Sequence, residues 1–208
     1  MSFKDRNEIH LARRMWHFGG VLTIFILYTL VTPRQAIWLA VPVSAFMIGS
    51  DLARQRSPRF NQFFLWLFGP FLRESERHSL AASTAMMAGV TLIIVLFPKS
   101  VVLLTLLFLA VGDPVASYFG IQFGKDKLIG NKSLQGSMAA FIACFALAFL
   151  YFSYLDLMTE RLFIACLLAG LIGAVSELVP IGKLDDNFVF PVLAAMQLTG
   201  LFYVFGGL

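Results

Sequence analysis

The sequence is short of charged residues, cysteine and histidine. Lysine, arginine, aspartate and glutamate together make up 13% of its 208 residues, whereas they make up about a quarter of a typical soluble domain. Hydrophobic residues account for 59%, and the mean hydropathy is +0.80. These values exclude an ordinary water-soluble domain and predict an integral membrane protein, whose apolar surface contacts lipid.

The two cysteines and the absence of internal repeats narrow the possible classes of protein further. Cys144 and Cys166 both lie within long apolar stretches, which argues against a disulfide framework or a zinc site and predicts two small core residues. The chain shows no supersecondary repeat and no low-complexity tail. We therefore expect a single transmembrane domain over residues 1–208. The net charge of +4 is explained by lysines and arginines that set the orientation of the chain in the membrane. No nucleic-acid partner is therefore expected.

Continuous apolar runs, rather than alternating ones, predict an all-α membrane protein and not a β-barrel. Seven spans are expected, at 16–32, 35–50, 79–97, 100–120, 136–155, 161–179 and 187–206. Between the second and third spans, Phe60 to Leu72 reads FNQFFLWLFGPFL, which is interrupted at Gly69-Pro70 and flanked by arginines. This aromatic segment predicts one further helix that lies in the membrane interface.

Charged residues are distributed unevenly between the two predicted sides. If the N-terminus is cytoplasmic, thirteen of the 16 lysines and arginines lie on the cytoplasmic side, and only Arg34, Lys99 and Arg161 lie on the other. This asymmetry predicts a cytoplasmic N-terminus and a C-terminus on the opposite side. Most carboxylates fall on the same predicted side as the cations. Membrane orientation explains the position of the cations but not that of the carboxylates. We therefore expect a cytoplasmic site that uses carboxylates.

Polar residues follow an apolar run at the end of the fourth span. Asp113 precedes Pro114, which favours a first helical turn, so the span is predicted to be broken there, with the aspartate at the break. A carboxylate inside a membrane is costly unless it is paired, protonated or bound to a cation, so Asp113 is a candidate functional residue. A helix cap is its structural alternative. Helix packing accounts for the small residues at every fourth position, which are Gly112, Ala116, Gly120 and Gly124.

The hairpin that follows predicts a phosphate site. It contains Lys125, Lys127 and Lys132, and Ser133 is placed to cap the fifth span. The N–H groups at a helix N-terminus bind phosphate, and neighbouring lysines add positive charge. With an aspartate able to hold Mg²⁺, these are the groups that phosphoryl transfer requires.

Three segments, in order, resemble one family. The first, ARRMWHFGG, contains Arg13, Arg14 and His17, and the third, GAVSELVPIGKLDDNFVFP, contains Glu177 and the run Leu184 to Asn187. Between them, the family signature is matched by Gly112, Asp113, Ala116, Ser117, Gly120, Phe123, Gly124, Lys132, Ser133 and Gly136. Over most of its length the chain resembles the membrane-embedded polyprenol, dolichol and phytol kinases, a family that includes the CTP-dependent diacylglycerol kinases.

The resemblance implies a kinase that transfers the terminal phosphate of CTP, or of another nucleotide, to the hydroxyl of a polyprenol, a phytol-like prenol or diacylglycerol. It also implies Mg²⁺ or another divalent cation. The implied catalytic residues are Asp113, Lys132, Glu177, Asp185 and Asp186, with Asp113 and Asp186 as metal ligands. The implied nucleotide-binding residues are Gly112, Ser117, Gly124, Lys125, Lys127, Lys132, Ser133 and Gly136. Arg13, His17 and Glu74 are implied for the lipid substrate.

Alternatives stay open at this point. The glycine-aspartate and lysine-serine elements are also similar to those of phosphatidate cytidylyltransferases, although the histidine of their closing signature is missing from KLDDNFVFPVL. A small ion-coupled transporter is a third possibility, but matching inverted halves are not found. Among single residues, Glu177 is equally well explained as a paired interfacial carboxylate, Asp185 and Asp186 as a helix start, and Arg13 and His17 as interfacial anchors.

Overall fold

The chain folds into helices joined by short turns. The computed structural model describes residues 11–77 and 79–208, and no strand forms within them. The α-helices are α1 (Leu11–Leu30), α2 (Pro33–Arg56), α3 (Pro58–Phe68), α4 (Ala82–Leu96), α5 (Lys99–Leu107), α6 (Asp113–Phe123), α7 (Leu134–Tyr154), α8 (Leu162–Leu178) and α9 (Asp186–Phe205). A π-helical turn, Phe108–Gly112, joins α5 to α6, and 3-10 turns lie at Gly69–Phe71, Glu74–Arg77 and Thr159–Arg161.

A helix lies at each of the seven predicted spans. In the described part of the chain, five helical stretches are long and apolar enough to cross a membrane: Pro33–Arg56, Lys99–Phe123, Leu134–Tyr154, Thr159–Leu178 and Asp186–Phe205. The other two predicted spans are α4, an apolar helix of 15 residues, and α1, which begins with the basic pair Arg13 and Arg14. The prediction of an all-α membrane protein is confirmed.

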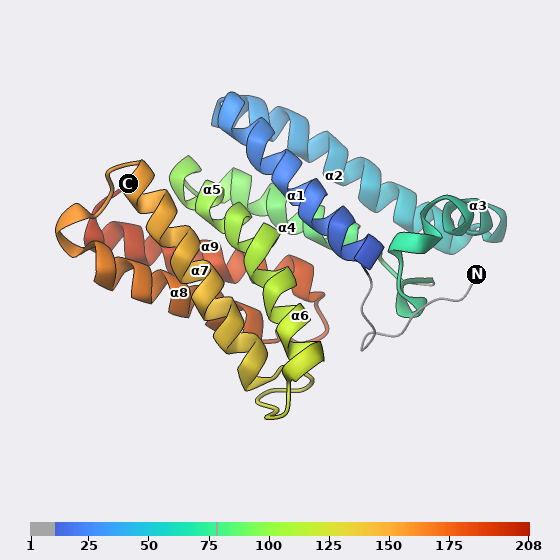
Figure 1. Cartoon of the computed structure of the whole chain (residues 1–208). Helices are drawn as coiled ribbons and strands as arrows, with labels where there is room; N and C mark the ends of the chain where they lie inside the picture. The colour runs from blue at the N-terminus through green and yellow to red at the C-terminus, as the bar shows by residue number, and fades with distance from the viewer. Residues whose placement is uncertain (1–10, 78) are drawn as a thin grey trace.

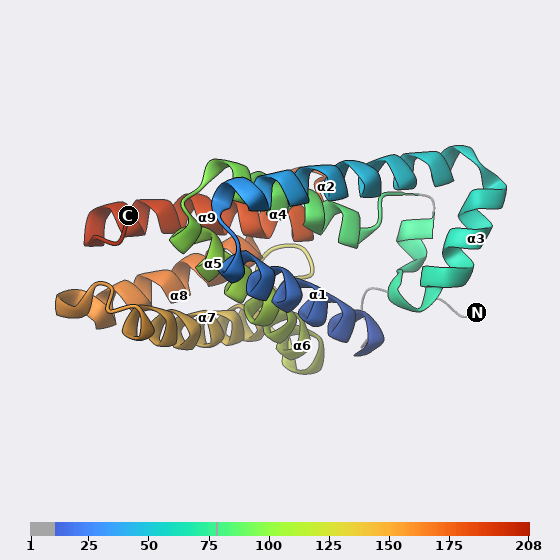
Figure 2. The same cartoon turned by 90° about the horizontal axis from the view of Figure 1, so that it is seen from above.

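The helices pack around α5, which lies between α1 and α9 (Figure 1). α7 lies against α8, and α4 lies between α2 and α9, as the view from above also shows (Figure 2). The core at this crossing contains Phe108, Phe152 and Phe202, all fully buried. Cys144 and Cys166 are buried and free, as predicted for two small core residues.

The fourth span is continuous, which corrects the prediction of a broken helix. Asp113 has helical backbone angles, φ −63° and ψ −49°, and its N–H donates to the carbonyl of Phe108, five residues earlier. Because Pro114 has no N–H to continue α-helical bonding, the chain passes this point through a wider π turn. No side-chain cap is present at the start of α6. The structural alternative for Asp113, a helix cap, is therefore excluded.

The predicted interfacial helix corresponds to α3. The Oγ of Ser57 accepts a hydrogen bond from the N–H of Phe60 and caps its start. The helix ends at Phe68, where Gly69 and Pro70 follow in a 3-10 turn. α3 lies at one end of the molecule, away from α7 and α8 (Figures 1 and 2). Its place in a membrane interface stays a prediction.

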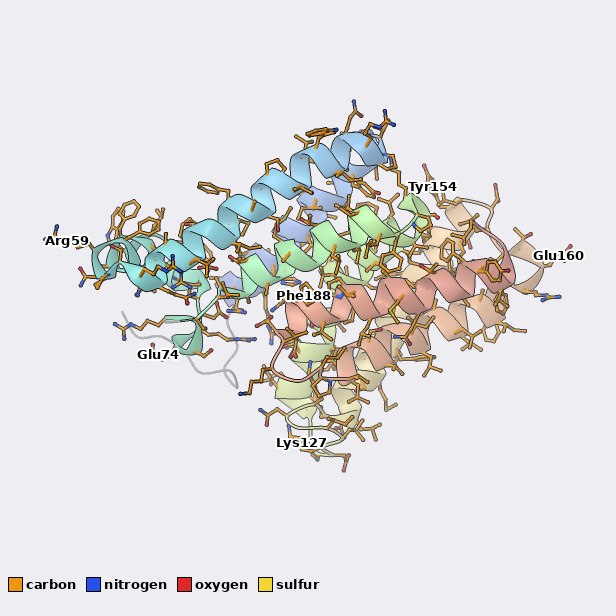
Figure 3. All side chains as sticks on the ribbon, turned by 180° about the vertical axis from the view of Figure 1, so that it is seen from behind. Arg59, Glu74, Lys127, Tyr154, Glu160 and Phe188 are labelled. Atoms are coloured by element: carbon orange, nitrogen blue, oxygen red, sulfur yellow. The ribbon has the colours of Figure 1, made fainter. Side chains whose placement is uncertain are left out.

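The two ends of the molecule carry different elements. Figure 3 shows Glu74 and Lys127 at one end and Tyr154 and Glu160 at the other. The hairpin between α6 and α7 belongs to the first end, and the turn Thr159–Arg161 belongs to the second. Which end faces the cytoplasm stays a prediction, and the first ten residues lie outside those that the structure describes.

Candidate active site

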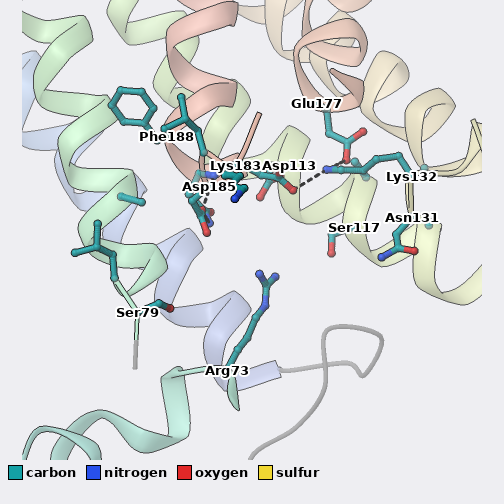
Figure 4. Close-up of a pocket in the computed structure, with 18 of the residues that line it drawn as sticks. Arg73, Ser79, Asp113, Ser117, Asn131, Lys132, Glu177, Lys183, Asp185 and Phe188 are labelled. Atoms are coloured by element: carbon teal, nitrogen blue, oxygen red, sulfur yellow. Dashed lines mark hydrogen bonds and ion pairs between the residues drawn. The ribbon is translucent and has the colours of Figure 1, made fainter. Parts of the chain in front are cut away.

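A cavity of about 1030 Å³ lies where α6, the α6–α7 hairpin, the end of α8 and the starts of α4 and α9 meet. Ten of the predicted site residues form part of its wall: Asp113, Ser117, Gly124, Lys127, Lys132, Ser133, Gly136, Glu177, Asp185 and Asp186. Several of them, with residues of the opposite wall, are drawn in Figure 4. The fold thus brings the second and third sequence segments of the resemblance into one site.

Lys132 lies at the centre of a charged cluster with Glu177, Asp186 and Asp113, called here the Lys132 cluster. Its Nζ is 2.6 Å from Oε1 of Glu177 and 3.4 Å from Oδ2 of Asp186. Burial by itself lowers the pKa of Lys132, but the carboxylates of Glu177, Asp113 and Asp186 outweigh burial and raise that pKa above its ordinary value. The ammonium is therefore held protonated, with three carboxylates around one cation.

Two helices begin at this cavity. The Oγ of Ser133 accepts a hydrogen bond from the N–H of Gly136 at 3.2 Å and caps α7. The Oδ1 of Asp185 accepts one from the N–H of Asn187 at 2.9 Å and caps α9. The Ser133 cap was predicted from the sequence, and the helix start at Asp185 was an alternative interpretation of that residue. The partial positive charges of the two helix N-termini therefore lie beside the Lys132 cluster, which favours an anionic ligand such as phosphate.

Asp113 lines the cavity on one side and contacts α1 on the other. Its Oδ2 is 3.9 Å from Nε2 of His17, and that nitrogen is 3.1 Å from the carbonyl oxygen of Leu109. The guanidinium of Arg14 lies 5.3 Å from the ring centre of Tyr118 in α6. The start of α1, with its predicted basic and histidine residues, therefore covers the back of the Asp113 carboxylate.

Glycine allows α6 and α7 to approach closely. A Cβ on Gly136 would lie 2.9 Å from the carbonyl oxygen of Ala116, and a Cβ on Gly124 would lie 2.6 Å from Oγ of Ser133. Real Cβ atoms do not sit this near to such neighbours, so side chains here would separate the two helices. The interpretation of the small-residue stripe as helix packing is confirmed.

Five predicted site residues lie outside the cavity wall. Gly112 is buried in the core, where a Cβ would lie 2.7 Å from Sγ of Cys144. Lys125 is exposed on the hairpin, and its backbone N–H donates to Oε1 of Gln135 at 3.2 Å. His17 contacts Asp113 from behind the wall, as described above. The remaining two are Arg13 and Glu74.

The acid that pairs with the start of α1 is Glu76. Arg13 donates to Oε1 of Glu76 at 2.6 Å, and the Glu76 side chain is 6% exposed. Glu74 instead contacts Arg77 at 3.3 Å, with half of its side chain exposed. In a 3-10 turn, residues two apart point in different directions, so only one of the two acids reaches α1. The sequence did not reveal which acid does so.

Sequence reasoning also missed a buried ion pair at the end of α2. Asp51 and Arg54 are hydrogen-bonded to each other, with side chains 1% and 0% exposed. Arg54 donates to the carbonyl of Glu76 at 3.0 Å, and Oδ2 of Asp51 accepts from the N–H of Ala81 at 3.0 Å. The pair therefore holds the backbone at Glu76, Ser79 and Ala81. The described residues 73–77 and 79–81 are called segment 73–81 below. The available signal was the spacing of three residues between an acid and an arginine, but surface pairs share that spacing.

Segment 73–81 contributes to a second wall, which is partly polar and partly apolar. The polar and charged wall residues that were not predicted are Gln55, Arg73, Ser79, Thr84, Asn131, Lys183 and Asn187. The apolar ones include Ile48, Leu80, Ala85, Ala88, Leu184 and Phe188. In Figure 4, Arg73 points into the cavity from the side opposite Lys132.

The carboxylates of the cavity suit a Mg²⁺ ion that is shared with phosphate. Within the described residues, no three His, Cys, Asp or Glu side chains are grouped so that they could hold a metal by themselves. In nucleotide-dependent enzymes, however, Mg²⁺ binds through one or two carboxylates and completes its coordination with phosphates and water. The side chains of Asp113 and Asp186 are 24% and 33% exposed. They are accessible oxygen donors of the kind that Mg²⁺ uses.

Fold and cavity define a class: a multi-pass membrane protein with a charged cavity at which two helices begin. Comparison with known proteins places the chain within that class. It is 32% identical over 158 residues to CTP-dependent diacylglycerol kinase 1 of Schizosaccharomyces pombe, across 71% of this chain and 72% of the relative. It is 25% identical over 224 residues to the protein of the same name in Saccharomyces cerevisiae, across 98% and 77%.

A bacterial relative, the uncharacterized protein RP860 of Rickettsia prowazekii, is 26% identical over 203 residues, across 95% of this chain and 97% of the relative. No family model and no solved structure matches. The chain belongs to the family of CTP-dependent lipid kinases that contains these fungal enzymes. The resemblance noted in the sequence is confirmed at this level.

Proposed function

We propose that the protein transfers the terminal phosphate of CTP to the hydroxyl of a membrane lipid alcohol, and that diacylglycerol is the acceptor. The observation that carries the proposal is the Lys132 cluster, where a protonated ammonium and three carboxylates lie beside two helix N-termini. Phosphoryl transfer depends on positioning and charge neutralisation more than on covalent chemistry with the protein, and this cluster supplies groups for both. The names of the fungal relatives support CTP and diacylglycerol.

We assign the phosphate contacts to the hairpin and the start of α7. The Nζ of Lys132 and the first N–H groups of α7, which follow the cap Ser133, are the donors nearest to the cluster. Lys127 adds a cation on the same wall. Ser117 of α6 is a further hydroxyl there. Lys125 is exposed away from this wall, so we give it no role in binding.

Asp113 and Asp186 are the residues that would hold Mg²⁺. When bound, the ion would neutralise charge on the phosphate oxygens that change during transfer. The other two acids have different tasks. Glu177 is 5% exposed at its side chain and binds Lys132, so it positions the ammonium. Asp185 caps α9 and holds that helix start at the cavity.

The lipid acceptor is assigned to the apolar part of the second wall. Ala85 and Ala88 lie one turn apart on α4, and Phe188 lies at the start of α9. Small residues on α4 leave room for a glycerol backbone, and the apolar lining suits the first carbons of its acyl chains. In this arrangement the acceptor hydroxyl faces the Lys132 cluster. Its proton passes to a cavity carboxylate as the terminal phosphate is transferred, and CDP leaves.

One assay tests the proposed reaction. Protein in lipid nanodiscs is given CTP or ATP, labelled in the terminal phosphate, with dioleoylglycerol, undecaprenol, dolichol or phytol. We expect labelled phosphatidate from CTP and dioleoylglycerol, and much less product from ATP or from the prenols. Release of pyrophosphate with formation of a CDP-lipid would instead place the protein with the cytidylyltransferases. A labelled prenyl phosphate as the main product would keep the kinase and change its acceptor.

We further propose that the cavity faces the cytoplasm, as the distribution of lysine and arginine predicts. Lys125→Cys on the exposed hairpin should react with a membrane-impermeant maleimide only after the cytoplasmic side has been opened. The native thiols of Cys144 and Cys166 are buried, so they give little background. Labelling of intact cells would reverse the proposed orientation.

A further inference from the structure

The Lys132 cluster carries an excess of negative charge. Glu177 and Asp186 contact Lys132, and Asp113 is a third carboxylate in the same field. Asp185 lies in the same wall. A nucleoside triphosphate is strongly anionic, so beside these four carboxylates its phosphates favour further cations in addition to Lys132 and the wall residues Lys127 and Lys183. A divalent ion offsets only part of this charge.

Arg73 places a cation on the facing wall. It forms part of the cavity, and its guanidinium points into the space opposite Lys132 and Asn131 (Figure 4). Arginine is suited to this task because its planar guanidinium donates paired hydrogen bonds to phosphate oxygens and stays charged. The charge distribution of the cavity and the direction of the Arg73 side chain therefore both favour a phosphate contact at Arg73.

The backbone beside Arg73 is held in place. Arg54, which is fully buried, donates to the carbonyls of Glu76 at 3.0 Å and Ser79 at 2.5 Å. Arg13 of α1 also binds Glu76, and the N–H of Glu76 donates to the carbonyl of Arg73 at 3.0 Å. A residue on such a fixed segment loses less freedom when a ligand binds. The buried pair at the end of α2 thus supports a binding residue at the cavity.

We propose that Arg73 binds the phosphates of the nucleotide across the cavity from Lys132. This inference rests on the proposed function, because it takes CTP as the ligand. It assigns Arg73 to nucleotide affinity and leaves the acceptor site to the apolar part of the wall. Arg77 provides a matched control, since it lies in the 3-10 turn that follows Arg73, contacts Glu74 and is not part of the cavity wall.

The test compares Arg73→Gln, Arg73→Lys and Arg77→Gln in the full-length protein in nanodiscs. CTP binding is measured by calorimetry with Mg²⁺, and KM is measured separately for CTP and for dioleoylglycerol. Arg73→Gln should weaken CTP binding and raise the KM for CTP by about tenfold or more, which is the loss expected for a hydrogen bond to a charged group. The KM for dioleoylglycerol should change less than about twofold, as should every constant of Arg77→Gln.

The variants distinguish a failure of the inference on Arg73 from a failure of the proposed function. A folded Arg73→Gln protein with unchanged CTP affinity, or with a higher KM for dioleoylglycerol alone, overturns the inference. If Arg73→Gln does not fold, Arg73→Lys decides. It keeps the charge but loses the paired geometry, so an affinity about threefold or more below wild type supports the inference, and wild-type affinity overturns it. A wild-type protein that neither binds nor consumes CTP would instead refute the proposed function.

Discussion

Two charged clusters adjoin the same cavity and differ in how their charges are balanced. In the first, Asp51 and Arg54 are both buried, and their polar atoms bond to each other and to backbone groups of segment 73–81. In the second, three carboxylates surround Lys132, and the side chains of Lys132, Asp113 and Asp186 are about a quarter to a third exposed. The first cluster has no capacity left for a ligand. The second keeps three of its side chains accessible to a ligand.

This difference separates structural from functional charge in a membrane protein. Buried ionised groups persist when partners satisfy them, whereas accessible carboxylates in excess of their cations mark a site where a cation or a substrate binds. Charge type and spacing in the sequence do not distinguish the two clusters. The exposure of the charged side chains does.

The largest effect is expected at Asp113. Asp113→Asn keeps the volume but loses the negative charge that we propose holds Mg²⁺, and activity with CTP should fall by about a thousandfold or more. No capping bond depends on this residue, so thermal unfolding of the variant should match the wild type. A near wild-type rate with unchanged magnesium dependence would remove Asp113 from the mechanism.

Substitution in the Asp51–Arg54 cluster should lower the stability of the protein. Arg54→Met leaves the Asp51 carboxylate buried without its partner, and the free energy of unfolding should fall by about 3 to 5 kcal/mol. Arg56→Met is the matched control, because Arg56 is exposed on the same helix. Thermal unfolding in detergent measures both variants. A loss in Arg54→Met no greater than in Arg56→Met would show that the pair is not needed to hold the fold.

Lys132→Met should affect activity more than stability. Loss of a phosphate contact should lower the rate by about a hundredfold, and partial exposure limits the stability loss to about 1 to 2 kcal/mol. The double variant Lys132→Met with Glu177→Gln removes the unpaired buried acid. It should recover the stability and leave the activity low. Recovery of activity in the double variant would mean that Lys132 serves only to neutralise Glu177.

Glu74→Gln and Glu76→Gln form a smaller comparison within one turn. Glu74 is half exposed and contacts Arg77, so its variant should change activity less than about twofold. Glu76 is buried against Arg13, so its variant should reduce the free energy of unfolding by about 1 to 3 kcal/mol. Thermal unfolding and CTP kinetics of both variants test this order. An equal response at the two positions would contradict it.

The smallest expected effect is that of alkaline pH on Lys132. Its pKa in the folded protein is raised, so its contribution to stability is complete below its unfolded pKa of about 10.4 and is lost as pH rises through the higher folded value. CTP affinity and thermal stability should therefore show no loss that depends on Lys132 between neutral pH and about pH 9. The Lys132→Met protein provides the baseline for that comparison. A wild-type transition below about pH 9 that this variant lacks would show a lowered pKa.

Much of the fold followed from periodicity and polarity. A helix lies at each of the seven predicted spans, five of these helical stretches are long and apolar enough to cross a membrane, and Ser133 and Asp185 cap helices as the sequence indicated. The hairpin and the nearby aspartate predicted that Asp113 and Lys132 share a site, whereas Glu177, 45 residues after Lys132, was assigned to it only through the family resemblance. No local pattern encodes such a contact.

Three features were missed for physical reasons. Pro114 indicated a break, but the backbone can pass a proline through a π turn, which the residue pattern does not show. Glu74 and Glu76 are chemically alike, and only the phase of a short turn decides which of them meets Arg13. Asp51 and Arg54 have the spacing of a surface pair, and their burial depends on segment 73–81 folding over them.

The π turn has a geometric consequence for Asp113, the proposed metal ligand. Each residue advances an α-helix by about 100°, and a π turn absorbs one extra residue, so everything after it occupies the angular place of the preceding position. Asp113 therefore stands where Gly112 would stand in an uninterrupted helix, while Phe108 upstream keeps its place in the core. The π turn therefore sets the direction in which the Asp113 carboxylate points. A single deletion within Phe108–Gly112 would therefore restore a regular α-helix with this carboxylate still directed as it is now, whereas closing the π turn without a deletion would rotate it by about 100°.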